Sequence, residues 1–166
     1  MLNEFIGYVA VILHIWSFSS ENRRNILFIG SISLTLYISH IYFAGSSIGV
    51  IIIASLGLIS SVLGLYLSKP NRDKLIKFVP LLSISIFLFS GMDIMAFFAA
   101  LGTLFSTYAK LTEDVLKIKI IYLGSASSWL IIGILIHSTP AILFDTIGIS
   151  VLLLTIYNIK RKEKKT

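Results

Sequence analysis

The stretch LYLSKPNRDKLIKFVP (residues 65–80) sets a cluster of basic residues between two hydrophobic runs, and this arrangement recurs along the whole chain. All 14 Lys and Arg residues lie in or beside alternate gaps between hydrophobic runs. Short cytoplasmic loops of membrane proteins collect Lys and Arg. The pattern therefore predicts a protein that crosses a membrane several times. The basic residues are Arg23, Arg24, Lys69, Arg72, Lys74, Lys77, Lys110, Lys117, Lys119, Lys160, Arg161, Lys162, Lys164 and Lys165.

The hydrophobic runs predict seven membrane-spanning helices, because a spanning helix needs about 20 mostly apolar residues and at least about 17. The gaps at 45–47, 91–93 and 137–139 carry no Lys or Arg and alternate with the basic gaps. The sequence therefore predicts an all-α membrane protein with its N-terminus outside and its C-terminus in the cytoplasm. The runs are Glu4–Ser20, Ile26–Phe43, Ile48–Leu67, Leu75–Ser90, Ile94–Leu111, Ile118–Ile136 and Ala141–Tyr157.

The composition excludes an ordinary soluble domain, with 56% hydrophobic residues and a mean hydropathy of +0.92 over 166 residues. The net charge of +6 lies beside the predicted spans, so we attribute it to orientation and contact with anionic lipid, and we expect no nucleic-acid partner. The absence of cysteine excludes disulfides and thiol catalysis. We expect an uncleaved first span and a short projecting tail at residues 158–166.

An internal repeat relates the first three predicted spans to the last three. Shifting the chain by 92 positions superimposes their lengths and loop positions without a gap. The shift leaves one helix unmatched, so the sequence predicts a three-helix bundle at 1–69, a linking helix at 70–93 and a second bundle at 94–166. Matched pairs include Phe5 with Phe97, Glu21 with Glu113, Ser33 with Ser125, and Tyr37 with Trp129.

This order of three helices, one helix and three helices resembles the SWEET and PQ-loop membrane proteins. The whole chain is also similar to the bacterial inner-membrane family typified by YgjV. The features that carry this second resemblance are Arg23-Arg24, His40-x4-Gly45, Gly102-Thr103-x2-Ser106, Trp129, Asp145 and Asn158-x2-Arg161. The resemblance implies a multi-pass protein of the bacterial inner membrane, in which a small substrate crosses between two bundles. The family resemblance itself implies no settled activity.

The chain departs from the SWEET pattern in three ways. It lacks the PQ dipeptide, and the first and fifth spans lack the proline that bends those helices in SWEET proteins. We therefore predict that Gly7 and Gly102 supply the hinges, because glycine in a membrane helix permits bending. The paired asparagines expected in sugar carriers are not at matching depth, so sugar transport is unsupported.

Asp145 is the residue most indicative of function. An aspartate in the hydrocarbon region costs about 2.5–3.5 kcal/mol on insertion scales, so it is expected to face the bundle interior or a water-filled cavity. There it would serve as a counter-ion for a ligand ammonium group or as a proton-coupling carboxylate. The alternative is a first-turn residue at the membrane surface, favoured by the helix dipole after Pro140.

We predict that Tyr37, His40, Trp129 and Asp145 line a substrate site between the bundles. Tyr37 and Trp129 would form its aromatic walls, and packing is the alternative for both. A histidine, His40 or His14, is expected to pair with Asp145 as a proton sensor or to be a hydrogen-bonded interior residue.

The sequence favours a small-solute transporter, with a membrane scaffold or receptor for a protein or lipid as the competing function. The expected partners are the lipid bilayer and an unknown small solute that is cationic or proton-coupled. Three scattered histidines do not have metal-ligand spacing, so we expect no metal and no cofactor. Enzyme motifs are absent from the sequence, so we expect no enzymatic activity. Homo-oligomerisation stays undecided.

Overall fold

The computed structural model describes residues 2–46, 48–89 and 93–163, and these residues form seven α-helices. The prediction of an all-α protein with seven helices is confirmed. Ser90, residues 47 and 91–92 of two predicted gaps, and the tail residues Lys164 and Lys165 lie outside the described residues. The helices are α1 (Leu2–Ser19), α2 (Arg23–Phe43), α3 (Ile48–Tyr66), α4 (Lys69–Phe89), α5 (Ile94–Leu111), α6 (Val115–Leu135) and α7 (Thr139–Glu163).

The α4 and α7 helices extend furthest beyond the predicted hydrophobic runs. The α4 helix begins at Lys69, whereas the hydrophobic run begins at Leu75. Pro70 fits its first turn because backbone N–H groups there have no intrahelical partner. The α7 helix continues to Glu163, so residues 158–163 of the predicted projecting tail are helical. Charged residues prolong both helices because straight-chain Lys, Arg and Glu are good helix formers.

Polar side chains cap the first turns of α2, α5 and α6. The side chains of Asn22, Asp93 and Asp114 accept backbone N–H groups in the first turns of α2, α5 and α6. These residues satisfy donors that a helix leaves unpaired at its N-terminus. They let the chain reverse direction within a few residues, which fixes consecutive helices as antiparallel neighbours.

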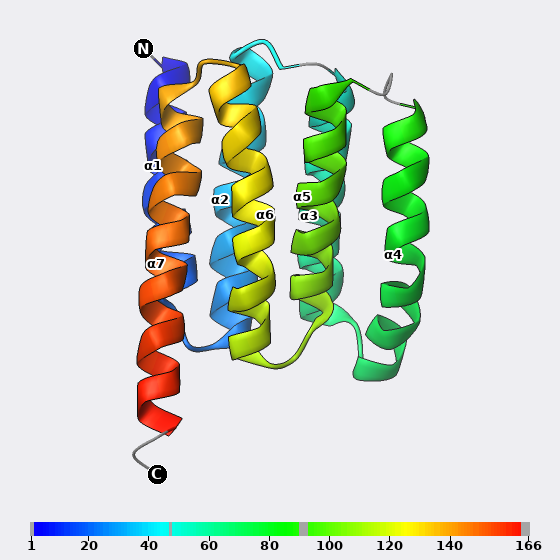
Figure 1. The fold of residues 1–166 in the computed structure, drawn as a ribbon, viewed down its shortest axis with the longest axis vertical. Helices are drawn as coiled ribbons and strands as arrows, with labels where there is room; N and C mark the ends of the chain where they lie inside the picture. Colours follow the sequence, from blue (N-terminus) through cyan, green and yellow to red (C-terminus); the bar gives the residue numbers. More distant parts are fainter. Residues whose placement is uncertain (1, 47, 90–92, 164–166) are drawn as a thin grey trace.

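Six helices form two facing layers, with α1, α2 and α3 in one and α7, α6 and α5 in the other (Figure 1). The layers meet where α1 packs on α7 and where α3 packs on α5, while α4 lies outside and packs mainly on α5. We call the end of the molecule that contains residues 20–23, 67–69 and 111–115 the basic end. The opposite end contains residues 44–46 and 136–138.

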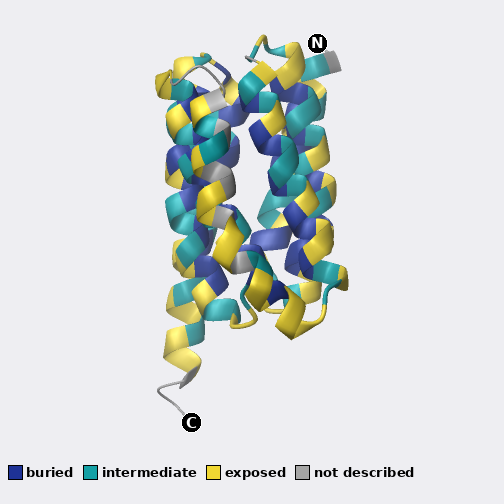
Figure 2. Ribbon diagram, turned by 90° about the vertical axis from the view of Figure 1, so that its right-hand side faces the viewer, coloured by how far each residue is buried: buried dark blue, intermediate teal, exposed yellow. Residues whose placement is uncertain are grey.

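The outer surfaces of the layers are largely exposed, and buried residues lie toward the space between the layers (Figure 2). Among the described residues, five helices are long and apolar enough to cross a membrane, namely α2, α3, α5, α6 and α7. The α4 helix differs because Lys69, Arg72, Asp73, Lys74 and Lys77 lie in its first half. The apolar exterior is the surface that lipid would cover.

Candidate functional site

A cavity of about 60 Å³ lies between the two layers. All six helices of the layers contribute to its lining, and none of the described lining residues belongs to α4. Because one water molecule needs about 10–15 Å³ on this scale, the cavity has room for about four to six waters. Its polar lining residues are His14, Ser17, Tyr37, Thr103, Ser106, Lys110, Tyr122, Ser125, Trp129 and Asp145.

Asp145 lies in the second turn of α7 and is only 2% exposed. Its Oδ2 atom is buried and has no hydrogen-bond partner among the described residues. The structure therefore does not place Asp145 in the first turn of α7, as the alternative interpretation did. A buried carboxylate oxygen without a partner is rare in native proteins and is a candidate contact for a ligand or an ordered water.

Aromatic side chains form the wall beside Asp145. The Tyr37 ring lies 4.5 Å from the Phe144 ring and 6.2 Å from the Trp129 ring, measured between centroids. The Tyr37 hydroxyl is buried and has no partner within the described part of the chain. The structure thus brings together three of the four predicted site residues: Tyr37, Trp129 and Asp145.

His40 lies at the opposite end and is not among the residues that line the cavity. Its Nε2 atom lies 2.8 Å from Ser138 Oγ, and its Nδ1 atom lies 3.0 Å from Asn3 Oδ1. Ser138 also accepts the N–H of Ala141 in the first turn of α7. His40 therefore links α2 in one layer to the start of α7 in the other.

His14 is the histidine that the structure places in the cavity. Its ring stacks on Phe144 at 3.7 Å between centroids, with 23° between the planes. The Nε2 atom is buried and has no hydrogen-bond partner among the described residues. The sequence offered His14 and His40 as equal candidates for the neighbour of Asp145. The packing of the helices places only His14 in the cavity lining.

Lys110 is a lining residue that the sequence prediction missed, because it was assigned to a basic gap. The side chain is only 4% exposed, and Nζ donates a hydrogen bond of 2.7 Å to the carbonyl of Gly57. The signal was helical phase: Thr103, Ser106 and Lys110 are spaced by three and four residues and share one face of α5. That face lines the cavity.

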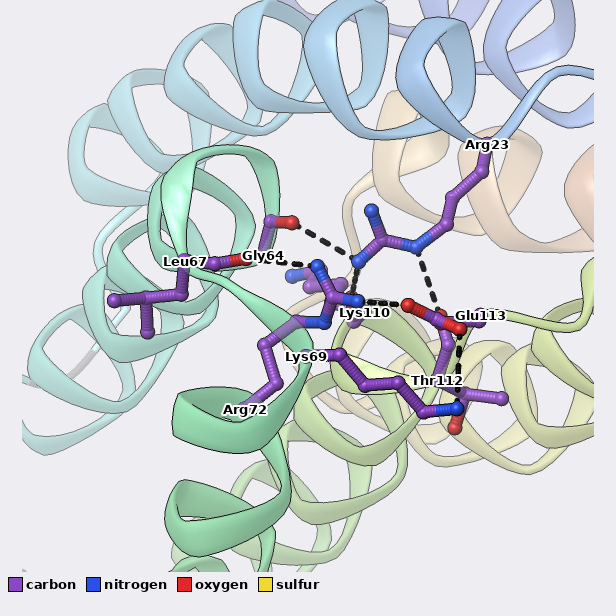
Figure 3. Close-up of polar contacts among 8 residues, drawn as sticks. All are labelled: Arg23, Gly64, Leu67, Lys69, Arg72, Lys110, Thr112 and Glu113. Carbon is purple, nitrogen blue, oxygen red and sulfur yellow. Dashed lines mark hydrogen bonds and ion pairs between the residues drawn. The ribbon is translucent and has the colours of Figure 1, made fainter.

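Arg23 closes the basic end by binding the last carbonyls of two helices (Figure 3). Its Nη2 group donates to Gly64 O at 3.0 Å and to Lys110 O at 2.8 Å, and its Nε group donates to Thr112 O at 2.9 Å. Gly64 belongs to α3, and the other two carbonyls lie at the end of α5. Positive charge is favoured there because helix C-termini carry partial negative charge.

The same end holds ion pairs between separate parts of the chain. Arg72 of α4 binds the Leu67 carbonyl and the carboxylate of Glu113, and Lys69 Nζ lies 3.7 Å from Glu113 Oε2 (Figure 3). Glu113 lies between α5 and α6. Through Glu113, these contacts attach the start of α4 to the loop between α5 and α6.

Lys119 of α6 binds carbonyls at the end of α1, which lies in the other layer. Its side chain is 1% exposed, and Nζ donates to Phe18 O at 2.5 Å and to Ser20 O at 2.9 Å. Next to these carbonyls, Glu21 accepts a hydrogen bond of 2.7 Å from Lys162 at the end of α7. The Lys162 ammonium lowers the pKa of the exposed Glu21 carboxyl. The sequence places Lys119 beside a basic gap, and in the structure its ammonium group caps the end of α1.

The predicted hinge glycines lie within unbroken helices. A Cβ atom at Gly7 would lie 2.7 Å from Pro140 Cβ, and one at Gly102 would lie 2.7 Å from Trp129 Nε1. In this structure, both glycines allow close approach of a neighbouring helix. Their role as hinges stays a prediction.

The family described as Imp-YgjV, bacterial inner membrane protein, matches residues 1–163. No curated protein and no solved structure matched the chain. The match covers all seven helices and every residue of the cavity lining.

Proposed function

Because the chain belongs to the Imp-YgjV family of bacterial inner membrane proteins, we propose that it is a small-solute transporter or facilitator in that membrane. One observation carries the proposal. Asp145, Tyr37 and His14 present buried polar atoms without described protein partners to a cavity between the layers. Ionisable groups inside membrane proteins are rare and commonly mark the path of an ion or substrate.

We further propose seven spans, with the N-terminus outside and the basic end in the cytoplasm. The distribution of Lys and Arg supports this orientation. The helix bounds support a parallel repeat, because adding 92 to those of α1 (2–19) and α2 (23–43) gives those of α5 (94–111) and α6 (115–135). In this arrangement, the two layers are the two repeats, and α4 links them.

The proposed mechanism is a rocking motion of one layer against the other, with access to the cavity from alternate sides. At the opposite end, His40 and Ser138 join the layers, and at the basic end Arg23 joins α2 to the end of α5. Hydrogen bonds have net values of about 0.5–1.5 kcal/mol, or about 1.5–3 with a charged partner, so such contacts are able to break and re-form.

Single cysteines test whether the cavity is accessible to solutes, and this cysteine-free chain needs no prior engineering. Ser125→Cys places a nearly isosteric thiol in the cavity lining. Ser127→Cys, two residues along the same helix, places an exposed thiol outside that lining. A charged methanethiosulfonate reagent added to membrane vesicles is expected to modify the Ser125→Cys protein much faster than the Ser127→Cys protein.

Ala54→Cys provides the same test from α3 in the other layer, because Ala54 also lines the cavity. We expect labelling from both sides of the membrane if the layers rock. Absence of labelling at both Ala54→Cys and Ser125→Cys would indicate a packed bundle. That result would favour the competing function of a membrane scaffold or receptor.

A further inference from the structure

We propose that the cavity binds a small amphoteric solute, with its anionic group near Lys110 and its cationic group near Asp145. A short ω-amino acid is the simplest member of this chemical class. The inference rests on the proposed function and names the substrate class of the same site. It differs from the sequence-based expectation of a cationic solute because Lys110 supplies a second, positive charge.

The first argument is that one buried cavity contains an amine side chain and a carboxyl side chain, which carry opposite charges when ionised. Lys110 is 4% exposed and Asp145 is 2% exposed. Within the described ranges, neither side chain is in an ion pair. Lys110 uses one of its three donors on the Gly57 carbonyl, and Asp145 Oδ2 has no described partner. An uncompensated buried charge is costly, and a ligand with both charges would compensate the two groups together.

The second argument is the depth of the two charged residues. Both α5 and α7 run from the opposite end toward the basic end (Figure 1). Lys110 is in the last turn of α5, whereas Asp145 is in the second turn of α7. The backbone of Lys110 therefore lies nearer the basic end, and the backbone of Asp145 lies nearer the opposite end. A ligand that meets both needs its charges at opposite ends of its own chain.

The third argument is the size and lining of the cavity. A volume of about 60 Å³ corresponds to about four to six water-sized atoms, which is the size of glycine or β-alanine and smaller than a sugar. Tyr37 and Phe144 pack together beside Asp145, and Trp129 lies on the same wall. Aromatic faces attract a ligand ammonium group, so they favour placing the cationic end there.

Ligand-dependent thermal unfolding of the purified full-length protein tests the proposal. The probes are β-alanine with both charges, propylamine with the positive charge alone, and propionate with the negative charge alone. We expect β-alanine to raise the melting temperature of the wild-type protein at concentrations where the other two produce smaller shifts. A wild-type protein that responds to one single-charge probe as strongly as to β-alanine, or to no probe, would overturn the proposal.

Two variants give a crossed pattern that a general loss of stability would not produce. Asp145→Asn is expected to weaken β-alanine and propylamine binding at least tenfold and to leave propionate binding unchanged. Lys110→Met is expected to weaken β-alanine and propionate binding by a similar factor and to leave propylamine binding unchanged. Asp73→Asn and Lys117→Met remove the same charges at exposed positions outside the cavity and serve as matched controls.

If Asp145→Asn and Lys110→Met do not fold, the conservative variants Lys110→Arg and Asp145→Glu provide the test. They keep the charge type and are expected to retain β-alanine binding. Failure of the crossed pattern with accessible cysteines at Ala54 and Ser125 would reject the amphoteric ligand and leave transport intact. Inaccessible cysteines together with no β-alanine response would reject both proposals.

Discussion

Replacement of Arg23 by methionine should strongly destabilise the fold, because one guanidinium group holds together the ends of three helices. Arg23 begins α2 and binds carbonyls at the ends of α3 and α5. Two of the three carbonyls belong to the buried residues Gly64 and Lys110, and the third belongs to the partly exposed Thr112. Methionine replaces the aliphatic part of the side chain and removes the donors of all three hydrogen bonds.

The expected loss of stability is calculated from the carbonyls of the buried residues Gly64 and Lys110. A buried group left without its partner costs about 1–3 kcal/mol, so two such carbonyls give about 2–6 kcal/mol. Relief of the desolvation of the guanidinium and local relaxation offset part of this loss. We therefore expect Arg23→Met to lower the free energy of unfolding by about 2–4 kcal/mol. Arg23→Lys should recover part of the loss, because an ammonium group lacks the planar fork of donors.

Arg24→Met is the matched control, since Arg24 is the next residue, carries the same charge and is exposed. Each variant removes one positive charge from the same loop region, so the effect on membrane orientation is expected to be equal. Only the hydrogen bonds to the carbonyls distinguish the two variants. Unfolding by sodium dodecyl sulfate in mixed micelles, followed by circular dichroism, measures the difference. A gap below about 0.5 kcal/mol between Arg23→Met and Arg24→Met would refute the capping role, because surface substitutions change stability by that amount.

Two further predictions concern a packed glycine and an exposed ion pair. Gly102→Ala should destabilise by about 1–3 kcal/mol in the same assay and shift Trp129 fluorescence, because the new methyl group would lie 2.7 Å from Trp129 Nε1. Gly57→Ala is its control, since the nearest atoms would lie at an ordinary 3.5 Å, and an equal loss there would contradict the steric argument. Glu21→Gln should reduce stability at neutral pH, with a difference from wild type that disappears under acid. The pKa of Glu21 is lowered in the folded state by Lys162, so its contribution is complete above the unfolded pKa and is lost as pH falls through the folded pKa; a pH-independent difference would exclude the pair.

The number of helices could be predicted from hydrophobic runs, and three residues of the cavity lining from single residues within those runs. Tyr37, Trp129 and Asp145 were identifiable because each interrupts an apolar run at depth. His40 met the same criterion, yet it lies at the opposite end, bonded to Asn3 and Ser138. Hydropathy gives the position of a residue along a span, whereas rotation about the helix axis decides which neighbour it meets.

The basic residues illustrate why the remaining features escaped prediction. The Lys and Arg pattern predicts orientation from loops alone and treats every cation in a gap as equivalent. In the structure, Lys117 is exposed while Lys119, two residues later, is buried and caps α1. Two residues correspond to about 200° around a helix, so one faces outward when the other faces the partner layer.

The arrangement of the helices explains why these basic side chains point into the bundle. The helices α1, α3, α5 and α7 all end at the basic end, so the negative ends of four helix dipoles gather there. At this end, Arg23 and Lys119 bind carbonyls at helix ends, where the last carbonyls have no intrahelical partner. The buried Lys110 instead extends from this end to the Gly57 carbonyl within α3. A basic residue that contributes to the predicted orientation is therefore also available to close the basic end of the bundle or to place an ionisable group in its interior.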